Sequence, residues 1–65
     1  SEHSRQGALE ALDKVTALRK VAPSAAADAV YVQALKMLAF TTTSAELRNY
    51  YLSEACIVEG GCVAP

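Results

Sequence analysis

Side chains that carry out chemistry are scarce in this sequence. Its 65 residues include one histidine, two cysteines and no tryptophan. Because His3 is the sole imidazole and lies in a terminal segment, neither a Ser-His-Asp nor a Cys-His arrangement can be built. Gly60 and Gly61 follow a helical segment instead of preceding one, so they do not form a phosphate-binding loop. We therefore expect no enzymatic activity and no cofactor.

The chain also lacks a cluster of charge of either sign. Six basic and seven acidic residues are scattered along it, with a net charge of −1. We therefore expect no nucleic-acid partner, because no basic patch could meet a phosphate backbone. The longest apolar run, Ala34 to Phe40, is interrupted by Lys36 and is far shorter than the roughly 20 residues that span a bilayer. We expect no membrane span.

Large apolar residues are few, although 52% of the sequence is hydrophobic, because much of that fraction is alanine. A chain of this length folds as one domain, residues 1–65, and buries only about 60% of its unfolded surface. The large residues available for a core are Leu9, Leu12, Leu18, Leu35, Leu38, Met37, Phe40, Leu47, Leu52, Ile57 and three tyrosines. So small a core usually needs a disulfide, a metal or a partner subunit.

A first helix is expected from about Ser4 to Val21. Apolar residues recur there at spacings of three and four, which places them on one helical face. They are Ala8, Ala11, Leu12, Val15, Leu18 and Ala22. Pro23 ends this helix because it lacks an N–H and disfavours helix at the residue before it. We expect residues 1–5 to be flexible.

A second helix is expected from Ala25 to about Phe40, with Ser24 as its N-cap. One face would carry Ala27, Tyr31, Ala34, Leu35 and Leu38, whereas Val30, Met37 and Phe40 fall elsewhere on the helix. A helix that is apolar on most sides is usually buried on most sides. The sequence therefore predicts more apolar surface on this helix than two neighbouring helices can cover.

A third helix is expected from Ser44 to about Val58. Thr43 and Glu46 fit the capping-box pattern at its start, and Gly60-Gly61 ends it. Its apolar face would carry Leu47, Tyr50, Tyr51, Ile57 and Val58. Glu54 lies near the middle of that face, where it would reach solvent or pair with Arg48. The predicted fold class is all-α: a small three-helix domain, made of a helical hairpin plus a third helix.

The two cysteines, Cys56 and Cys62, flank the two glycines that end the third helix. A chain reversal there brings them to the Cα separation of about 5.5 Å that a disulfide requires. We predict a local disulfide that ties residues 60–65 back to the helix. Redox or metal chemistry is the alternative, but the spacing is not that of a C-x2-C site. Two further alternatives are a disulfide between two chains and cysteines that stay as free thiols.

The sequence begins with Ser1 and not with methionine. Either a leader has been removed or the chain was trimmed for expression. Removal of a leader, together with two cysteines, predicts a periplasmic or secreted protein. If Ser1 is the true N-terminus, its amine and the imidazole of His3 could bind Cu(II) or Ni(II). A flexible terminus without metal is the expected alternative.

Five large residues are candidates for binding a partner: Tyr31, Met37, Phe40, Tyr50 and Tyr51. Tyr50 and Tyr51 diverge by about 100° around a helix, so one can pack inside while the other lies toward the surface. Tyrosine is enriched at interfaces because it joins a large ring to a polar tip. The alternative is that these rings are ordinary core residues with solvated hydroxyls.

These observations predict a non-catalytic accessory subunit that binds a larger protein, in a periplasmic or secreted complex such as an oxidoreductase. Two alternatives belong to other classes. The chain could form a homo-oligomer with the second helix at the seam. It could also be a secreted peptide effector or toxin acting on membranes, although such helices usually carry Lys and Arg along one face. No motif in the sequence is specific to a protein family.

Overall fold

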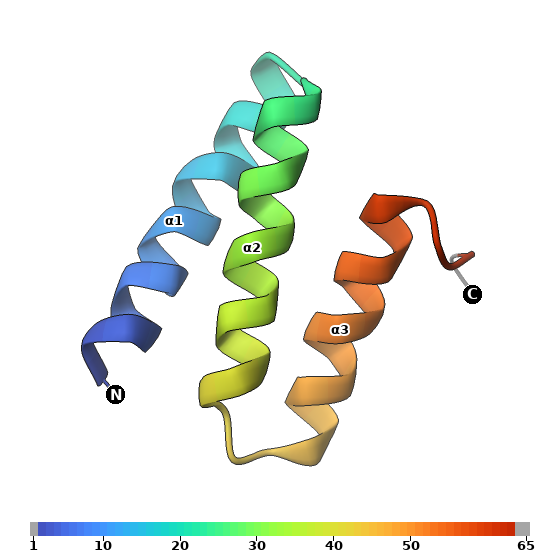
Figure 1. Ribbon diagram of the computed structural model, residues 1–65. Helices are drawn as coiled ribbons and strands as arrows, with labels where there is room; N and C mark the ends of the chain where they lie inside the picture. Colours follow the sequence, from blue (N-terminus) through green and yellow to red (C-terminus); the bar gives the residue numbers. More distant parts are fainter. Residues whose placement is uncertain (1, 64–65) are drawn as a thin grey trace.

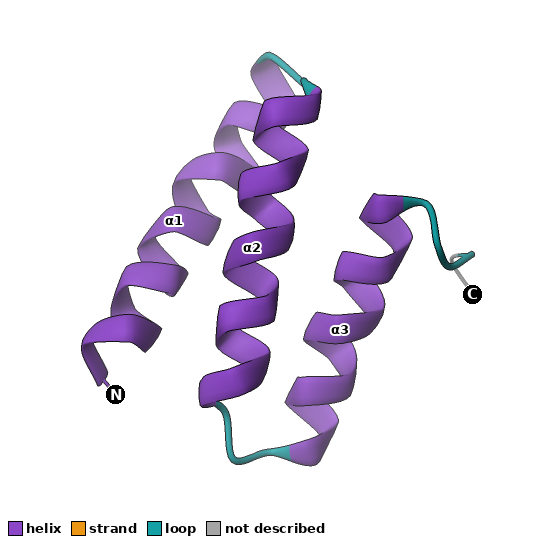
Figure 2. Cartoon of the chain, in the orientation of Figure 1, coloured by secondary structure: helices purple, strands orange, loops and turns teal. Residues whose placement is uncertain are grey.

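The computed structural model describes residues 2–63, with the side chains of residues 5–63. It contains helices α1 (Glu2–Val21), α2 (Ala25–Thr41) and α3 (Ala45–Glu59), joined by short loops (Figure 1). No strand is present between residues 2 and 63 (Figure 2). The predicted all-α fold of three helices is confirmed.

The three helices form a shallow layer with α2 in the middle (Figure 1). Both α1 and α3 pack against α2, whereas the described backbones of α1 and α3 do not approach each other. The Cα atoms span 31 × 27 × 13 Å, so the molecule is thin in one direction. Because neither outer helix closes over α2, one side of α2 stays uncovered, and the exposed residues of α2 all lie on that side.

The core of this layer is built from few large side chains. Leu35 and Leu38 of α2 are the largest fully buried residues. The central cluster comprises Val32, Leu35 and Ala55, and against it pack Leu12, Tyr31, Tyr51 and Val58. Alanines fill most of the other buried positions, namely Ala8, Ala27, Ala34 and Ala39. Small residues allow the helices to lie close together, but they contribute little apolar burial.

The loop between α1 and α2 follows the sequence expectation. The hydroxyl of Ser24 accepts a hydrogen bond of 3.1 Å from the backbone N–H of Ala27, so Ser24 is the N-cap of α2. At the end of α3, Gly60 has a φ of 85°, a conformation that glycine adopts without steric cost. Its N–H bonds to the carbonyl of Ile57 and closes the last turn, as expected.

The predicted start of α3 is wrong by one residue. Ser44, and not Thr43, is the N-cap, because its hydroxyl accepts a hydrogen bond of 3.2 Å from the N–H of Leu47. The N–H of Ser44 in turn donates to the hydroxyl of Thr42 at 3.2 Å. This bond comes from the preceding loop, and it holds Ser44 in the extended conformation that an N-cap needs.

The predicted face of α1 is only partly buried. Ala8 and Val15 are buried against α2, but Leu18 is 50% exposed and Ala22 is exposed. The reason is that α1 has one neighbouring helix instead of two. A periodic apolar pattern shows which side of a helix faces the core, but it does not show how many neighbouring helices cover that side.

Replacing Leu35 by alanine should lower the free energy of unfolding by about 3 kcal/mol, the usual cost of a cavity at a buried leucine. That is a large share of the roughly 3–10 kcal/mol expected for a chain of this length. Urea unfolding followed by circular dichroism measures the change. The matched control is Leu9→Ala on α1, where the leucine is 43% exposed and the loss should be less than half as large. Equal losses would contradict the placement of Leu35 at the centre of the core.

Candidate partner-binding surface

One side of α2 is open to solvent and mostly apolar, with Lys36 exposed at its edge. This side, the α2 outer face, consists of Ala26, Ala29, Val30, Gln33, Met37 and Phe40, all of them exposed. Phe40 is 89% exposed and Met37 is 47% exposed. Phe40 follows Tyr31 by nine residues, which turns it to the opposite side of the helix. The outer face therefore points away from the cluster that holds the three helices together.

The exposed ring of Phe40 borders an open hollow between the end of α2 and the start of α3. Ala39, Arg48 and Leu52 complete the lining, and the hollow has a volume of about 340 Å³. Leu52 is 44% exposed. The sequence indicated Leu52 only as a candidate core residue, and its place beside Phe40 depends on how α3 lies against α2.

Arg48 is fixed in this hollow by bonds to the backbone of α2. Its Nε donates to the carbonyl of Ala39 at 3.4 Å, and its Nη2 donates to the carbonyl of Thr42 at 3.1 Å. A cation at these carbonyls is favourable because they lie at the negative end of the helix dipole. The predicted pairing of Arg48 with Glu54 is wrong, because Arg48 turns toward the end of α2 while Glu54 turns toward Tyr31.

Tyr31 connects all three helices on the opposite side of the layer. The guanidinium carbon of Arg19 on α1 lies 4.1 Å from the centre of the Tyr31 ring. The Tyr31 hydroxyl donates a hydrogen bond of 3.3 Å to Glu54 on α3. Arg19 also forms an ion pair of 2.8 Å with Asp28. Since α1 and α3 do not meet through their backbones, this set of side chains is a link between them across α2.

The surroundings of Tyr31 favour its neutral form. Burial raises the pKa of the Tyr31 hydroxyl above its usual value, and the negative charge of Glu54 and the hydrogen bond to it raise that pKa further. The positive charge of Arg19 opposes this shift without cancelling it. The phenol is therefore held as a hydrogen-bond donor to Glu54.

Tyr50 and Tyr51 divide between surface and interior, as their spacing predicts. Tyr51 is half-buried and packs against the central cluster, whereas Tyr50 is 60% exposed. Their ring centres lie 5.8 Å apart with the planes at 62°, an edge-to-face arrangement. Such pairs add a modest stabilisation to the area that they bury.

The five predicted partner-binding residues do not form one patch. Met37 and Phe40 lie on the α2 outer face, whereas Tyr31 and Tyr51 pack against the central cluster. Tyr50 is exposed beside Tyr51. That these residues bind a partner stays a prediction. The other exposed large apolar residues of the described chain are Leu9, Leu18, Val21, Val30, Leu47, Leu52 and Val63.

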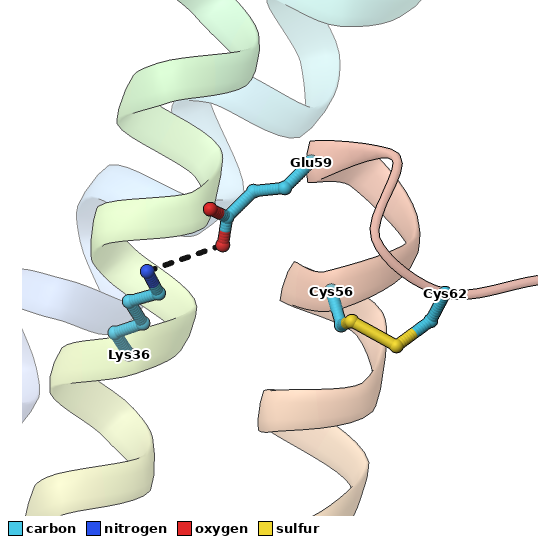
Figure 3. The surroundings of a disulfide bond; sticks show 4 residues. All are labelled: Lys36, Cys56, Glu59 and Cys62. Atoms are coloured by element: carbon cyan, nitrogen blue, oxygen red, sulfur yellow. Dashed lines mark ion pairs between the residues drawn. A yellow bond between two sulfur atoms is a disulfide. The ribbon is translucent and has the colours of Figure 1, made fainter.

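The predicted disulfide between Cys56 and Cys62 is confirmed, with a Cα–Cα distance of 5.2 Å (Figure 3). The backbone N–H groups of Gly61 and Cys62 both donate to the carbonyl of Cys56. One turn away, Glu59 forms an ion pair of 3.1 Å with Lys36 of α2. The last turn of α3 is therefore tied both to the C-terminal tail and to α2.

Two predictions concern the N-terminus. Ser1 and the side chain of His3 lie outside the described part of the chain, so the Cu(II) or Ni(II) site stays a prediction, as does the flexibility of residues 1–5. Within the described part, no three His, Cys, Asp or Glu side chains gather in a way that could hold a metal ion. Over the same residues, no helix has the length and apolar character needed to cross a membrane.

Fold and surface together define a small disulfide-bonded three-helix protein whose central helix has one face uncovered. Comparisons with protein-family models, with curated proteins and with solved structures found no match. We therefore base the functional proposal on the surface of this chain.

Stability should fall when the pH rises past the ordinary pKa of tyrosine, near 10. The pKa of Tyr31 is higher in the folded chain than in the unfolded chain. The unfolded state therefore loses its proton first, and the stabilisation present below about pH 10 is lost as the pH rises through the folded pKa. Urea unfolding across this range measures the effect, and Tyr31→Phe should reduce it. A Tyr31→Phe variant with unchanged pH dependence would contradict the role given to Tyr31.

Removing the disulfide by Cys56→Ala together with Cys62→Ala should lower the free energy of unfolding by roughly 2 kcal/mol, because the closed loop is short. The loss should concentrate at the end of α3, where hydrogen exchange of the last-turn amides should accelerate. The amides of α1 serve as an internal control. Equal acceleration in α1 and in the last turn of α3 would contradict a local role for the disulfide.

Proposed function

We propose that this protein is a non-catalytic accessory subunit that binds a larger protein through the C-terminal end of the α2 outer face. The observation that carries the proposal is the position of Phe40, which is 89% exposed on a mostly apolar face of α2. A fully exposed phenylalanine leaves about 1.5–3 kcal/mol of burial energy unused in the free chain. A partner that covers the ring would recover that energy.

The surroundings of Phe40 suit a protein interface. Leu52 widens the apolar area, and the hollow beside the ring offers space for a side chain of the partner. Arg48 is held at the hollow by two carbonyls, so little flexibility is lost when a partner contacts it. Interfaces are typically built in this way, from an aromatic anchor, an arginine and a few aliphatic residues.

The disulfide supports an oxidising compartment for the complex. Disulfides persist in the periplasm and in secreted proteins and are rare where thiols are kept reduced. The Cys56–Cys62 bond supports a periplasmic or secreted location on this ground. We give the chain no reaction of its own, and its contribution to the complex would be to cover and stabilise a surface of the larger subunit.

Site-specific photo-crosslinking in cells of the native source tests this function. A photoreactive residue at position 40 should capture one larger protein, identified by mass spectrometry. The same residue at Ala17, an exposed position on α1, should not capture it. Capture of the same protein from both positions, or of none from position 40, would contradict the proposed surface.

Replacing Phe40 by alanine provides the energetic test once that protein is in hand. Affinity should fall by about tenfold or more, as is usual for a central aromatic anchor. The free energy of unfolding of the isolated chain should change by less than about 0.5 kcal/mol, because the ring is exposed there. A stability loss as large as the binding loss would show that Phe40 is a folding residue instead.

A further inference from the structure

A second apolar feature lies between α1 and α2. It does not include Phe40, but it shares four residues with the α2 outer face, namely Ala26, Val30, Gln33 and Met37. Two adjoining hollows of about 370 and 240 Å³ follow one another along the two helices. Ala11 of α1 and Val30 of α2 line both of them, so the hollows form one groove, the α1–α2 groove. The groove is separate from the hollow at Phe40, which α2 forms with α3.

The α1–α2 groove combines raised and recessed positions on the same surface. Ala8 and Ala34 are buried and small, so they form a recessed floor. Val30 stands between the two hollows and is 46% exposed, while Leu18 and Met37 are about equally exposed at either end. A two-fold interface requires one patch to supply both the ridge and the hollow that receives it. This patch supplies both.

Charge does not oppose the meeting of two such surfaces. Lys14 is the one charged residue that lines the described groove. The whole chain carries a net charge of only −1, so two copies would repel each other weakly. A groove with one exposed lysine in its lining can therefore face a copy of itself, provided that the two Lys14 side chains keep their ammonium groups in solvent.

The surface area of the chain matches what such a pair would need to bury. The chain exposes 4662 Å², whereas a compact monomer of 6.9 kDa is expected to expose about 4,000 Å². The excess, about 650 Å², falls within the 600–1,000 Å² that each partner buries in a stable interface. The excess is a consequence of the single-layer fold, since helical domains usually bury the apolar stripe of each helix between two layers.

From these observations we propose that two copies of this chain pair through the α1–α2 groove about a two-fold axis. Val30 of each copy enters a hollow of the other, and the two layers together form a six-helix, two-layer body. This pairing goes beyond the proposed function and does not depend on it. The hollow at Phe40 lies between α2 and α3, so a larger partner would use a different part of the surface.

Sedimentation equilibrium of the disulfide-intact chain over a range of concentrations tests the pairing. The expected result is a reversible monomer–dimer equilibrium. Val30→Lys should raise the dimer dissociation constant about tenfold or more, because a charge would enter an apolar hollow. The matched control is Val21→Lys at the end of α1, where the valine is 85% exposed and lies outside the groove. This control should dimerise like the original chain.

Circular dichroism of each variant checks that the helices are retained. If Val30→Lys does not fold, Leu18→Lys on the other wall of the groove takes its place. A chain that is monomeric at every concentration overturns the pairing, and so does an assembly larger than a dimer. A dimer that tolerates lysine in the groove as well as it tolerates Val21→Lys overturns it too. None of these results bears on the crosslinking at position 40.

Discussion

The rest of the structure depends on the packing of α2 between two helices whose backbones do not approach each other. Leu35 and Leu38 are buried because α1 and α3 both lie against the same helix. With α1 and α3 apart, the described chain is a layer only 13 Å thick in its Cα atoms. A layer has two broad sides, and 65 residues are too few to cover both. The exposure of Met37 and Phe40 follows from this constraint.

Polar side-chain contacts help to hold α1 and α3 in place, although their backbones do not approach each other. Arg19, Tyr31 and Glu54 join the three helices on one side of the layer, and Arg48 joins α3 to the end of α2. Apolar burial alone is small here, because alanine supplies much of the core. Individual contacts at partly exposed sites contribute little. Their importance is geometric, since they set how α1 and α3 sit on α2 and so which part of α2 stays open.

Local chemistry made much of the fold predictable from sequence. Ser24 and Gly60 each act on their own turn, and the cysteine pair needed only the reversal at two glycines. Predictions failed where a residue outside the helix in question decides the outcome. The cap of α3 moved to Ser44 because the loop residue Thr42 binds its N–H, and Glu54 turned to a tyrosine 23 positions away. The exposure of Leu18 could not be predicted without knowing that α1 has only one neighbouring helix.

For the candidate binding surface, the sequence indicated that α2 has more apolar residues than its neighbours can cover. It did not indicate the hollows beside α2, because these form only where two helices lie side by side.

Solvent paramagnetic relaxation, measured by NMR on the dilute isolated chain, tests most directly whether α2 is left uncovered. A soluble paramagnetic agent broadens the resonances of side chains that it can approach. We expect strong broadening of the Phe40 ring and weak broadening of the Leu35 and Leu38 methyl groups on the same helix. If Phe40 were protected as well as those leucines, a single chain would enclose α2 by itself, and the case for a binding surface on this helix would fail.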